Sequence, residues 1–317
     1  MKRKNNSKGI FVVLAALLLA LALSGCVSGG TGGTGGQGGT GSSSGAVLEI
    51  SPSFSEALSL SEGERAQISA EIRNIGKTSL ENVNAVFYNF GSNILGCSDV
   101  YIGELSPGDS FEAMCELTAK PRDMWGDPGK ASFSQEISVK VKYSFPISGA
   151  FESIRVLSPE EYARVNPGAK VEEKTVTIGP VSLKAEFQRQ PAVSGKEFPV
   201  LLSFSVKTSG TEGIEMTEDR GTVAGAQLRI PETFSFSGKG SFDSAGIPCG
   251  DGRYICATKS GWAVSGKNNS VLSINVLPPD ISVPEETYSA RFDAEGFTVF
   301  KIARKKVSVS AKSEGSS

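Results

Sequence analysis

The sequence predicts an all-β protein with two antiparallel β-sandwich domains in tandem. Short segments alternate apolar and polar residues with a period of two, and turn signals rich in Gly, Pro, Asn and Asp separate them. No long stretch has the periodicity of a helix. The chain has 317 residues, which is more than one sandwich needs. We therefore expect a first sandwich over residues 46–158 and a second over residues 171–311.

Alternation is clear in the first of these domains. Because successive side chains of a strand point to opposite faces, such a segment buries one face and exposes the other. Turn signals at residues 74–76, 106–109 and 127–129 separate the strands. The expected strands cover residues 68–72, 83–87, 111–117, 137–143 and 150–157.

A short helix is expected between the two domains, in a linker over residues 159–170. Ser158 is a favourable N-cap, Pro159 suits the first helical position, and Glu161 follows three residues after the cap. The Asn-Pro-Gly turn at residues 166–168 ends the helix. We place the domain boundary here, although the same helix also fits the closing loop of the first domain.

The second domain repeats the alternating pattern. A polar, Gly-containing segment over residues 208–222 is expected to be a mobile loop, and residues 312–317 a disordered tail. Residues 61–64 and 193–196 are similar segments that each precede an alternating strand, which indicates two related sandwiches. The expected strands cover residues 181–187, 200–206, 272–276 and 307–309.

Residues 1–25 have the composition of a signal peptide, in which basic residues precede an apolar segment over residues 10–23. As a helix these 14 residues would span about 21 Å, which is short of a hydrocarbon core of about 30 Å. Leu23-Ser24-Gly25-Cys26 then resembles a lipobox. Cleavage there would make Cys26 the first residue of the mature chain and attach lipid to it.

The segment that follows predicts a tether. Residues 26–45 are rich in Gly, Ser and Thr, so they have nothing to bury and form a flexible coil. The expected location is the extracytoplasmic face of the cell membrane, with membrane lipid as a partner through Cys26. Two alternatives stay open. One is an uncleaved anchor that extends through Val27, and the other is a prepilin-type signal cut after Gly9.

Composition limits the chemistry. The chain contains no histidine, which removes Ser-His-Asp and Cys-His catalysis, imidazole general bases and His-ligated metal sites. Loss of Lys2, Arg3, Lys4 and Lys8 with the signal peptide leaves 28 basic against 34 acidic residues, a formal net charge of −6. This acidic balance gives no support to nucleic-acid binding. We expect no cofactor, no metal site and no enzymatic activity.

Three successive segments of the first domain carry a family resemblance. Residues 71–77 read as a strand that ends in an Asn-x-Gly turn, residues 81–87 follow as a strand, and residues 102–110 contain Leu-Ser-Pro-Gly-Asp. This succession resembles the CARDB-like (cell-adhesion-related) domains, which are Ig-like modules of archaeal S-layer-associated and bacterial surface proteins. The resemblance covers about residues 47–157. It implies a seven-stranded sandwich used as a spacer or adhesion module, and it supplies no catalytic residues.

The cysteines divide between the predicted parts. Cys26 belongs to the lipobox, and two of the others fall in each sandwich, which favours the pairs Cys97–Cys115 and Cys249–Cys256. Disulfides require export to an oxidising compartment, which the signal peptide provides. Neither spacing is a CxxC pair, so a zinc site is disfavoured. Buried free thiols are the remaining alternative.

A few exposed-loop candidates complete the set. An exposed Trp125 or Trp262 would stack on a sugar or anchor a partner, and packing against a loop or the disulfide is the favoured interpretation. Asn268 begins a glycosylation sequon. Acidic residues near the loops supply few convergent oxygens, so solvated loops are expected rather than calcium sites. Those acidic residues are Asp123, Asp127, Asp243 and Asp251, and a basic patch consists of Lys301, Arg304, Lys305 and Lys306.

Together these features predict a membrane-anchored lipoprotein that displays two sandwiches for surface interaction or adhesion. The main alternative is a structural or accessory spacer of the envelope, S-layer-associated or transporter-associated, without a ligand of its own. A ligand-binding lipoprotein is a weaker alternative. In the first case the partner is an envelope protein or polysaccharide whose identity the sequence leaves open.

Overall fold

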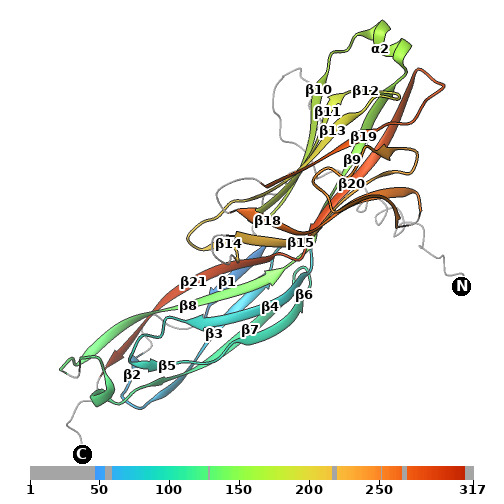
Figure 1. The fold of residues 1–317 in the computed structure, drawn as a ribbon. Helices are drawn as coiled ribbons and strands as arrows, with labels where there is room; N and C mark the ends of the chain where they lie inside the picture. Colours follow the sequence, from blue (N-terminus) through green and yellow to red (C-terminus); the bar gives the residue numbers. More distant parts are fainter. Residues whose placement is uncertain are drawn as a thin grey trace, which may run out of the picture. The chain divides into compact units, whose positions relative to one another are not determined.

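The computed structural model describes residues 47–53, 59–127, 129–215, 220–250, 252–265 and 270–310 (Figure 1). These residues form four largely antiparallel sheets, one α-helix and one short 3-10 helix, η1 (Arg122–Met124). The predicted all-β fold of antiparallel sandwiches is confirmed. The predicted signal peptide, Cys26, the predicted tether, Asn268 and residues 311–317 lie outside the described residues.

The first sandwich consists of sheets A and B. Sheet A has the order β1-β3-β7-β5, and sheet B has the order β14-β21-β8-β4-β6, with β2 paired to β21. Apart from β14 and β21, its strands come from the N-terminal part of the described chain. They are β1 (Leu48–Pro52), β2 (Ser59–Leu60), β3 (Arg65–Asn74), β4 (Leu80–Tyr88), β5 (Ile94–Leu95), β6 (Val100–Leu105), β7 (Ser110–Ala119), β8 (Ser132–Ser144), β14 (Glu212–Ile214) and β21 (Thr298–Ser310).

The second sandwich consists of sheets C and D. Sheet C has the order β12-β9-β20-β15-β18-β17, and sheet D has the order β10-β11-β13-β19-β16. The strands are β9 (Ile147–Leu157), β10 (Lys170–Ile178), β11 (Val181–Gln190), β12 (Ala192–Val193), β13 (Phe198–Val206), β15 (Arg220–Pro231), β16 (Ser235–Phe236), β17 (Ser244–Cys249), β18 (Tyr254–Ser265), β19 (Ser270–Leu277) and β20 (Glu285–Glu295).

The sheets divide the chain differently from the predicted boundaries. β9, expected to close the first sandwich, pairs with β20 in sheet C, and β21, expected in the second, pairs with β8 along its whole length in sheet B (Figure 1). The tandem boundaries 46–158 and 171–311 therefore need correction. Residues 147–297 are inserted between β8 and β21. Alternation marks a segment as a strand but does not specify its partner, which is why the sequence did not reveal the insertion.

With β21 in place, the first sandwich has Ig-like order. The succession β1-β3-β7-β5 against β21-β8-β4 corresponds to the two sheets of an Ig constant-type domain, with β6 added beside β4. The last of its seven principal strands is thus supplied from beyond the inserted sandwich. Val299, Val307 and Val309 of this strand are fully buried, so β21 contributes to the core as well as to the sheet.

Aromatic rings pack where the chain passes between the sandwiches. Phe145 lies on the connection from β8 to β9, and Phe297 lies on the connection from β20 to β21. Both side chains are buried, and their ring centroids are 5.2 Å apart in an edge-to-face contact. Phe297 also contacts Phe204 of β13, at a centroid distance of 5.3 Å. The two connections are therefore packed against each other.

Asn74 explains the motif that carries the family resemblance. Its buried side chain donates from Nδ2 to the carbonyls of Thr78 and Leu105, at 2.9 and 2.8 Å, and Oδ1 accepts from the Gly76 amide at 2.9 Å. Gly76 passes so close to Val47 that a Cβ would come within 2.9 Å of the Val47 Cγ1 atom. One side chain thus joins the Asn-x-Gly turn to the end of β6.

The Pro-Gly turn completes the same connection. Asp109 N donates to Ser106 O at 3.0 Å, and Gly108 at the third turn position has φ +87°, which favours glycine. Gly108 N then donates to Asn74 O at 2.9 Å, and Asn74 N donates to Asp109 O at 3.0 Å. The two sequence motifs are therefore a single hydrogen-bonded unit.

The predicted helix is confirmed as α2 (Pro159–Val165). Ser158 Oγ accepts from Glu161 N at 3.2 Å, Pro159 occupies the first turn, and Asn166 caps the end in the left-handed conformation. In contrast, the loop expected over residues 208–222 contains β14 and the beginning of β15. Its polar composition concealed β14, because the apolar partner for that strand is β21 at the other end of the chain.

Both predicted disulfides are present. Cys97–Cys115 joins the β5–β6 connection to β7, with a Cα–Cα distance of 5.3 Å. Cys115 is buried in the core of the first sandwich. Cys249–Cys256 joins the adjacent strands β17 and β18, with a Cα–Cα distance of 5.9 Å. The two bridges therefore staple different sandwiches.

Candidate functional site

The two tryptophans proposed as exposed anchors are both buried, with 4% of each side chain accessible. Trp125 Nε1 donates to Lys120 O at 2.8 Å, and its ring meets Phe133 edge-to-face. Trp262 packs against Phe204 with a centroid distance of 5.7 Å. Neither ring presents a face to a partner, which corrects the binding hypothesis. Both rings belong to the buried core, as the favoured interpretation expected.

Among the described residues, the acidic candidates Asp127 and Asp243 each contact a lysine and do not gather with other carboxylates. Asp243 accepts from Lys259 Nζ at 2.6 Å and from the Ser260 amide at 2.7 Å, and Asp127 pairs with Lys130 at 3.6 Å. The Lys259 ammonium lowers the pKa of the Asp243 carboxyl below its usual range, with help from the Ser260 amide. Within the described chain, no three Cys, Asp or Glu residues gather in a way that could hold a metal ion. Asp251 lies outside the described residues.

The basic patch near the C-terminal end is distributed along β21. Lys301 Nζ donates to Leu48 O at 2.5 Å, and Arg304 lies 3.9 Å from Glu136. These groups connect strands of the first sandwich. Among the helices that the structure describes, none has the length and apolar character required to cross a bilayer.

A cluster that the sequence did not reveal lies on the outer face of sheet C. In the antiparallel pairs β15–β20 and β15–β18, directly opposed residues project from the same face of the sheet. Arg229 of β15 lies opposite Arg291 of β20 and opposite Cys256 of β18. The intervening residues, such as Leu228 and Phe292, are fully buried between the sheets. Arg229 and Arg291 therefore project outward, side by side.

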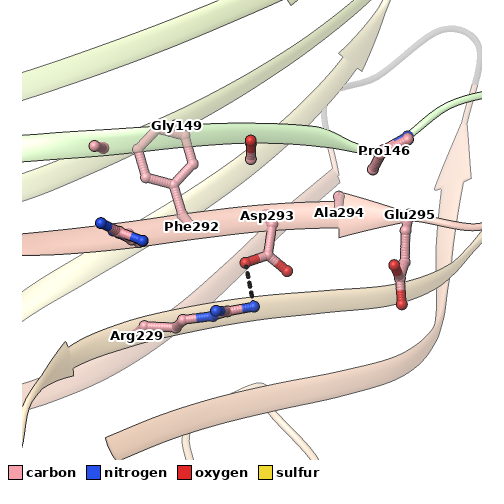
Figure 2. A pocket seen from close by; sticks show the side chains of 10 residues that line it. Pro146, Gly149, Arg229, Phe292, Asp293, Ala294 and Glu295 are labelled. Atoms are coloured by element: carbon pink, nitrogen blue, oxygen red, sulfur yellow. Dashed lines mark ion pairs between the residues drawn. The ribbon is translucent and has the colours of Figure 1, made fainter. Parts of the chain in front are cut away.

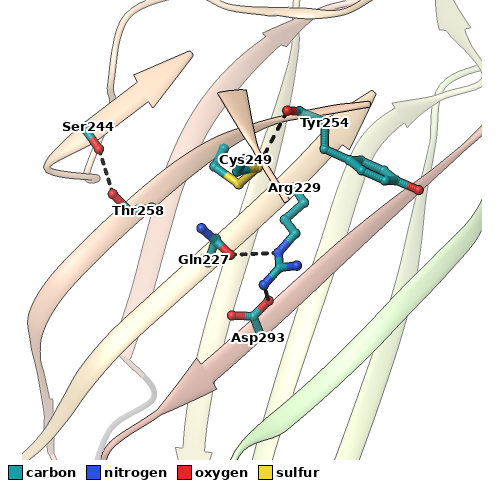
Figure 3. The surroundings of a disulfide bond; sticks show 8 residues. Gln227, Arg229, Ser244, Cys249, Tyr254, Thr258 and Asp293 are labelled. Atoms are coloured by element: carbon teal, nitrogen blue, oxygen red, sulfur yellow. Dashed lines mark hydrogen bonds and ion pairs between the residues drawn. A yellow bond between two sulfur atoms is a disulfide. The ribbon is translucent and has the colours of Figure 1, made fainter. Parts of the chain in front are cut away.

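The next pair of opposed residues on this outer face consists of Gln227 on β15 and Asp293 on β20. Asp293 supplies one negative charge beside the two arginines. Arg229 Nη2 lies 3.3 Å from Asp293 Oδ2, and Arg229 Nε donates to Gln227 Oε1 at 2.7 Å (Figure 3). Arg291 instead lies over the Tyr254 ring, with its Cζ 5.9 Å from the ring centroid. Of these two adjacent guanidinium groups, Arg229 contacts a carboxylate and Arg291 contacts an aromatic ring.

The second disulfide lies beside these arginines. Cys256 is opposite Arg229 on the outer face, and its side chain is buried although it is not part of the hydrophobic core. Cys249 and Tyr254 flank the turn between β17 and β18, and Figure 3 shows Cys249 close to Arg229. The bridge therefore ties the turn that carries Arg253 to the strand beside the arginine pair.

Two adjoining hollows open on this face. The first, of about 230 Å³, contains no carboxylate among its described lining residues; Arg253 in it already has an interaction within the chain. The second, of about 520 Å³, is lined among others by Arg229, Asp293 and Glu295 (Figure 2). It extends over β9, where Ser148 lies opposite Asp293 and Ala150 lies opposite Arg291. Arg229 and Arg291 line both hollows. The first is lined by Arg229, Cys249, Gly250, Arg253, Tyr254 and Arg291.

Asp293 is the titratable group at the centre of the second hollow. Burial raises the pKa of its carboxyl, Arg229 opposes that increase, and Glu295 adds to it. Only 27% of the Asp293 side chain is exposed. Protonation of Asp293 would remove the carboxylate that Arg229 contacts. The face would then become more positive.

The fold and the face together define a protein of two antiparallel sandwiches, one of Ig-like order, with an arginine-lined surface on the other. Residues 46–149 match the CARDB family model, so the predicted resemblance is confirmed for this segment. The match ends just after the chain leaves β8 for the inserted sandwich and does not include β21. No curated protein matches the chain.

Solved structures resemble the chain only distantly. They include the secreted serine protease VesC from Vibrio cholerae (9% identity, 81% of this chain and 50% of that chain, TM-score 0.21). A second is red sea bream transglutaminase (10% identity, 85% and 32%, TM-score 0.20), and a third is the CupB6 tip adhesin from Pseudomonas aeruginosa (8% identity, 84% and 98%, TM-score 0.17). The chain spans half or less of the first two. At these TM-scores, the likeness to these proteins indicates nothing about the function of the chain.

Proposed function

We propose that this chain is a lipoprotein anchored through Cys26 on the extracytoplasmic face of the membrane, where its sandwiches serve surface interaction or adhesion. The lipobox-like segment and the low-complexity residues after it support the anchor. The two disulfides support an oxidising compartment. The CARDB match supports a surface module for residues 46–149.

The observation that carries the interaction role is the arginine pair on the outer face of sheet C. Like charges directly opposite each other destabilise a sheet, so Arg229 and Arg291 are not explained by the stability of the fold. They line hollows that are open to solvent, where a ligand could reach both guanidinium groups. This arrangement suits the binding of a ligand.

A spacer role is the second candidate. The inserted sandwich is attached to the first by two connections rather than one, and Phe145 and Phe297 pack together on them. In addition, β14 pairs with β21 and so adds a segment of the insertion to sheet B. Such a double attachment suits a component that transmits force or keeps a distance.

Two measurements test the proposal. Intact-mass analysis of membrane and soluble fractions should show a wild-type chain that lacks residues 1–25, carries added acyl mass and stays with the membrane. Cys26→Ala should abolish the added mass and the membrane association of the cleaved chain. A wild-type chain that retains Met1 and has no added mass would sink the anchor.

The interaction role needs a separate experiment. Solubilised full-length protein should retain components of the cell envelope, and Arg291→Gln should reduce that retention. If the variant retains the envelope components as well as wild type does, the spacer role is the better account of the protein.

A further inference from the structure

We infer that the outer face of sheet C binds an acidic polysaccharide, with an acid group of one sugar in the arginine-lined hollow. This inference rests on the proposed function in surface interaction and names the ligand class for the same site. The acid group is a carboxylate or a sulfate, which a guanidinium recognises with the same fork of N–H donors. The contacts are those of Arg229 and Arg291, and the neighbouring hollow holds the adjoining sugars.

The charge pattern identifies the acid group. Arg229 has one carboxylate, Asp293 at 3.3 Å, and Arg291 has no ion pair with any carboxylate of the described chain. Both guanidinium groups face the hollow of about 230 Å³, whose described lining is otherwise aromatic, disulfide or arginine. An anion placed between them would relieve the repulsion of the cross-strand pair. A neutral ligand would leave that repulsion in place.

The adjoining hollow identifies the rest of the ligand. Its volume of about 520 Å³ lies within the range of pockets that hold small organic groups. Ser148, Asp293 and Glu295 line it, and these are acceptors or donors for hydroxyl groups rather than for further anions. Along the face, a site for an anion is therefore followed by sites for hydroxyl groups. This order matches a sugar acid followed by a hydroxyl-rich sugar.

The same pattern disfavours a nucleic acid. A nucleic-acid strand presents a phosphate at every step, and Asp293 and Glu295 would repel the phosphates next to the first one. Tyr254 is the aromatic ring at this hollow, and Arg291 lies over it rather than leaving it open to stack on a base.

The disulfide has a positioning role in this site. Cys249–Cys256 fixes the turn between β17 and β18, which carries Arg253 and Tyr254. Tyr254 in turn supports Arg291 through the ring contact. Loss of the bridge is therefore expected to weaken binding more than it changes the strands beneath, because β18 keeps its pairing with β15.

The experiment measures binding of the detergent-solubilised full chain to defined polymers by calorimetry. The probes are polygalacturonate for a carboxylate, dextran sulfate for a sulfate, dextran as a neutral polysaccharide and polyglutamate as an acidic peptide. We expect binding to polygalacturonate or dextran sulfate, with affinity that falls as salt rises, and little binding to dextran. Whichever of the two acidic polysaccharides binds identifies the acid group.

Three variants locate the binding. Arg291→Gln should weaken binding about tenfold or more, and Arg291→Lys should weaken it less, because lysine keeps the charge but not the fork. Arg73→Gln removes an exposed arginine of β3 in the first sandwich and should bind as wild type does. In a Trp125→Phe background, the fluorescence of Trp262 reports whether each variant retains the second sandwich.

Several outcomes would overturn the inference. They are failure of both acidic polysaccharides to bind, equal affinity for polyglutamate, or unchanged affinity in Arg291→Gln. None of these results bears on the proposed lipidation of Cys26, which the intact-mass measurement tests. If envelope components are still retained in an Arg291-dependent manner while the polysaccharides fail, the proposed function stands and only the ligand class is wrong.

Discussion

The two sandwiches differ in how the chain builds them. The second is formed by one continuous segment, residues 147–297, although β14 of this segment pairs with β21 of the first sandwich. The first needs β21 from the other end of the described chain, and β21 has a strand partner on each side, β8 and β14. Completion of the first sandwich therefore requires a contact across the whole inserted segment, which costs more chain entropy to form.

Both sandwiches contain ion pairs between strands, such as Arg65–Glu116 at 3.3 Å in the first and Arg155–Glu285 at 2.7 Å in the second. Each also places like charges directly opposite each other, Glu71 and Glu112 in sheet A and Arg229 and Arg291 in sheet C. Arg229 and Arg291 line two hollows on the outer face of sheet C. The discontinuous sandwich depends on its C-terminal strand for stability, while the continuous sandwich carries the arginine-lined face.

Of the changes proposed here, removal of β21 should have the largest effect on the folding of the first sandwich. A chain that ends after Phe297 keeps every strand of the second sandwich but loses the buried Val299, Val307 and Val309. We expect the first sandwich to unfold and the second to stay folded. The chain has two tryptophans, Trp125 in the first sandwich and Trp262 in the second, so single Trp→Phe backgrounds report each sandwich separately by fluorescence.

A chain that ends after Ser310 is the matched control, because it keeps the whole of β21, and it should unfold as wild type does. A chain ending at Phe297 in which Trp125 keeps its native emission would show that the first sandwich does not need β21.

This dependence also marks the limit of prediction from the sequence. The strands at residues 68–72, 137–143 and 200–206 were predictable because their alternation is local, and the structure confirms them in β3, β8 and β13. The partners of β9 and β21 were not, because alternation in one strand does not identify the strand beside it. The Asn-x-Gly and Pro-Gly turns were readable because they lie close in sequence.

The candidate site could not be predicted from the sequence either, because its residues become neighbours only in the folded sheet. β15 and β20 were not predicted as strands, although the buried Ala226, Leu228 and Ile230 of β15 and Ala290, Phe292 and Ala294 of β20 alternate with more exposed residues. Arg229 and Arg291 become neighbours only through the register of these two strands. Trp125 and Trp262 attracted attention by residue type, yet their burial depends on Phe133 and Phe204, which are remote in sequence.

The next largest effect should come from Asn74, whose buried side chain joins two turns of the first sandwich. Asn74→Ala would leave the Gly76 amide and the carbonyls of Thr78 and Leu105 without their side-chain partners. We expect a loss of about 3–5 kcal/mol in the free energy of unfolding of the first sandwich. Urea denaturation followed by Trp125 fluorescence in a Trp262→Phe background measures it.

Asn275→Ala is the control, since Asn275 is exposed in the second sandwich and should change stability by less than about 0.5 kcal/mol. A loss in Asn74→Ala no greater than that of the control would contradict the role of Asn74 in joining the two turns.

The disulfides should separate stability from binding. Cys97–Cys115 closes a separation of 18 residues and faces the core, so its replacement by two alanines should cost the first sandwich about 3 kcal/mol. Cys249–Cys256 closes a separation of 7 residues on the outer face and should cost the second sandwich about 2 kcal/mol.

Affinity for the acidic polysaccharide should show the opposite order, with the larger loss on removal of Cys249–Cys256. The Cys249→Ala/Cys256→Ala chain should lose affinity for the acidic polymer, and the Cys97→Ala/Cys115→Ala chain should keep it at temperatures where it is folded. Thermal unfolding and calorimetry on both chains provide the test. Equal losses of affinity in the two chains would show that the second bridge does not position the arginine-lined face.

The smallest expected effect concerns the link between the sandwiches. Glu215 follows β14 and pairs with Lys140 and Lys142 of β8, the latter at 3.4 Å. Burial raises the pKa of Glu215, but the two ammonium groups outweigh it, so the folded pKa lies below the usual value. The pair therefore adds stability above the ordinary Glu pKa of about 4.3, and that stability is lost as the pH falls through the lower folded pKa.

Glu215→Gln should accordingly cost less than about 1 kcal/mol at pH 7, because a third of the Glu215 side chain is exposed. The difference from wild type should shrink as the pH falls below 4, where the wild-type carboxyl also becomes neutral. Urea denaturation at pH 7 and pH 3 measures both values through Trp125. Glu116→Gln removes an exposed pair within sheet A and should have almost no effect at either pH. A pH-independent loss in Glu215→Gln would mean that the side chain contributes through packing rather than charge.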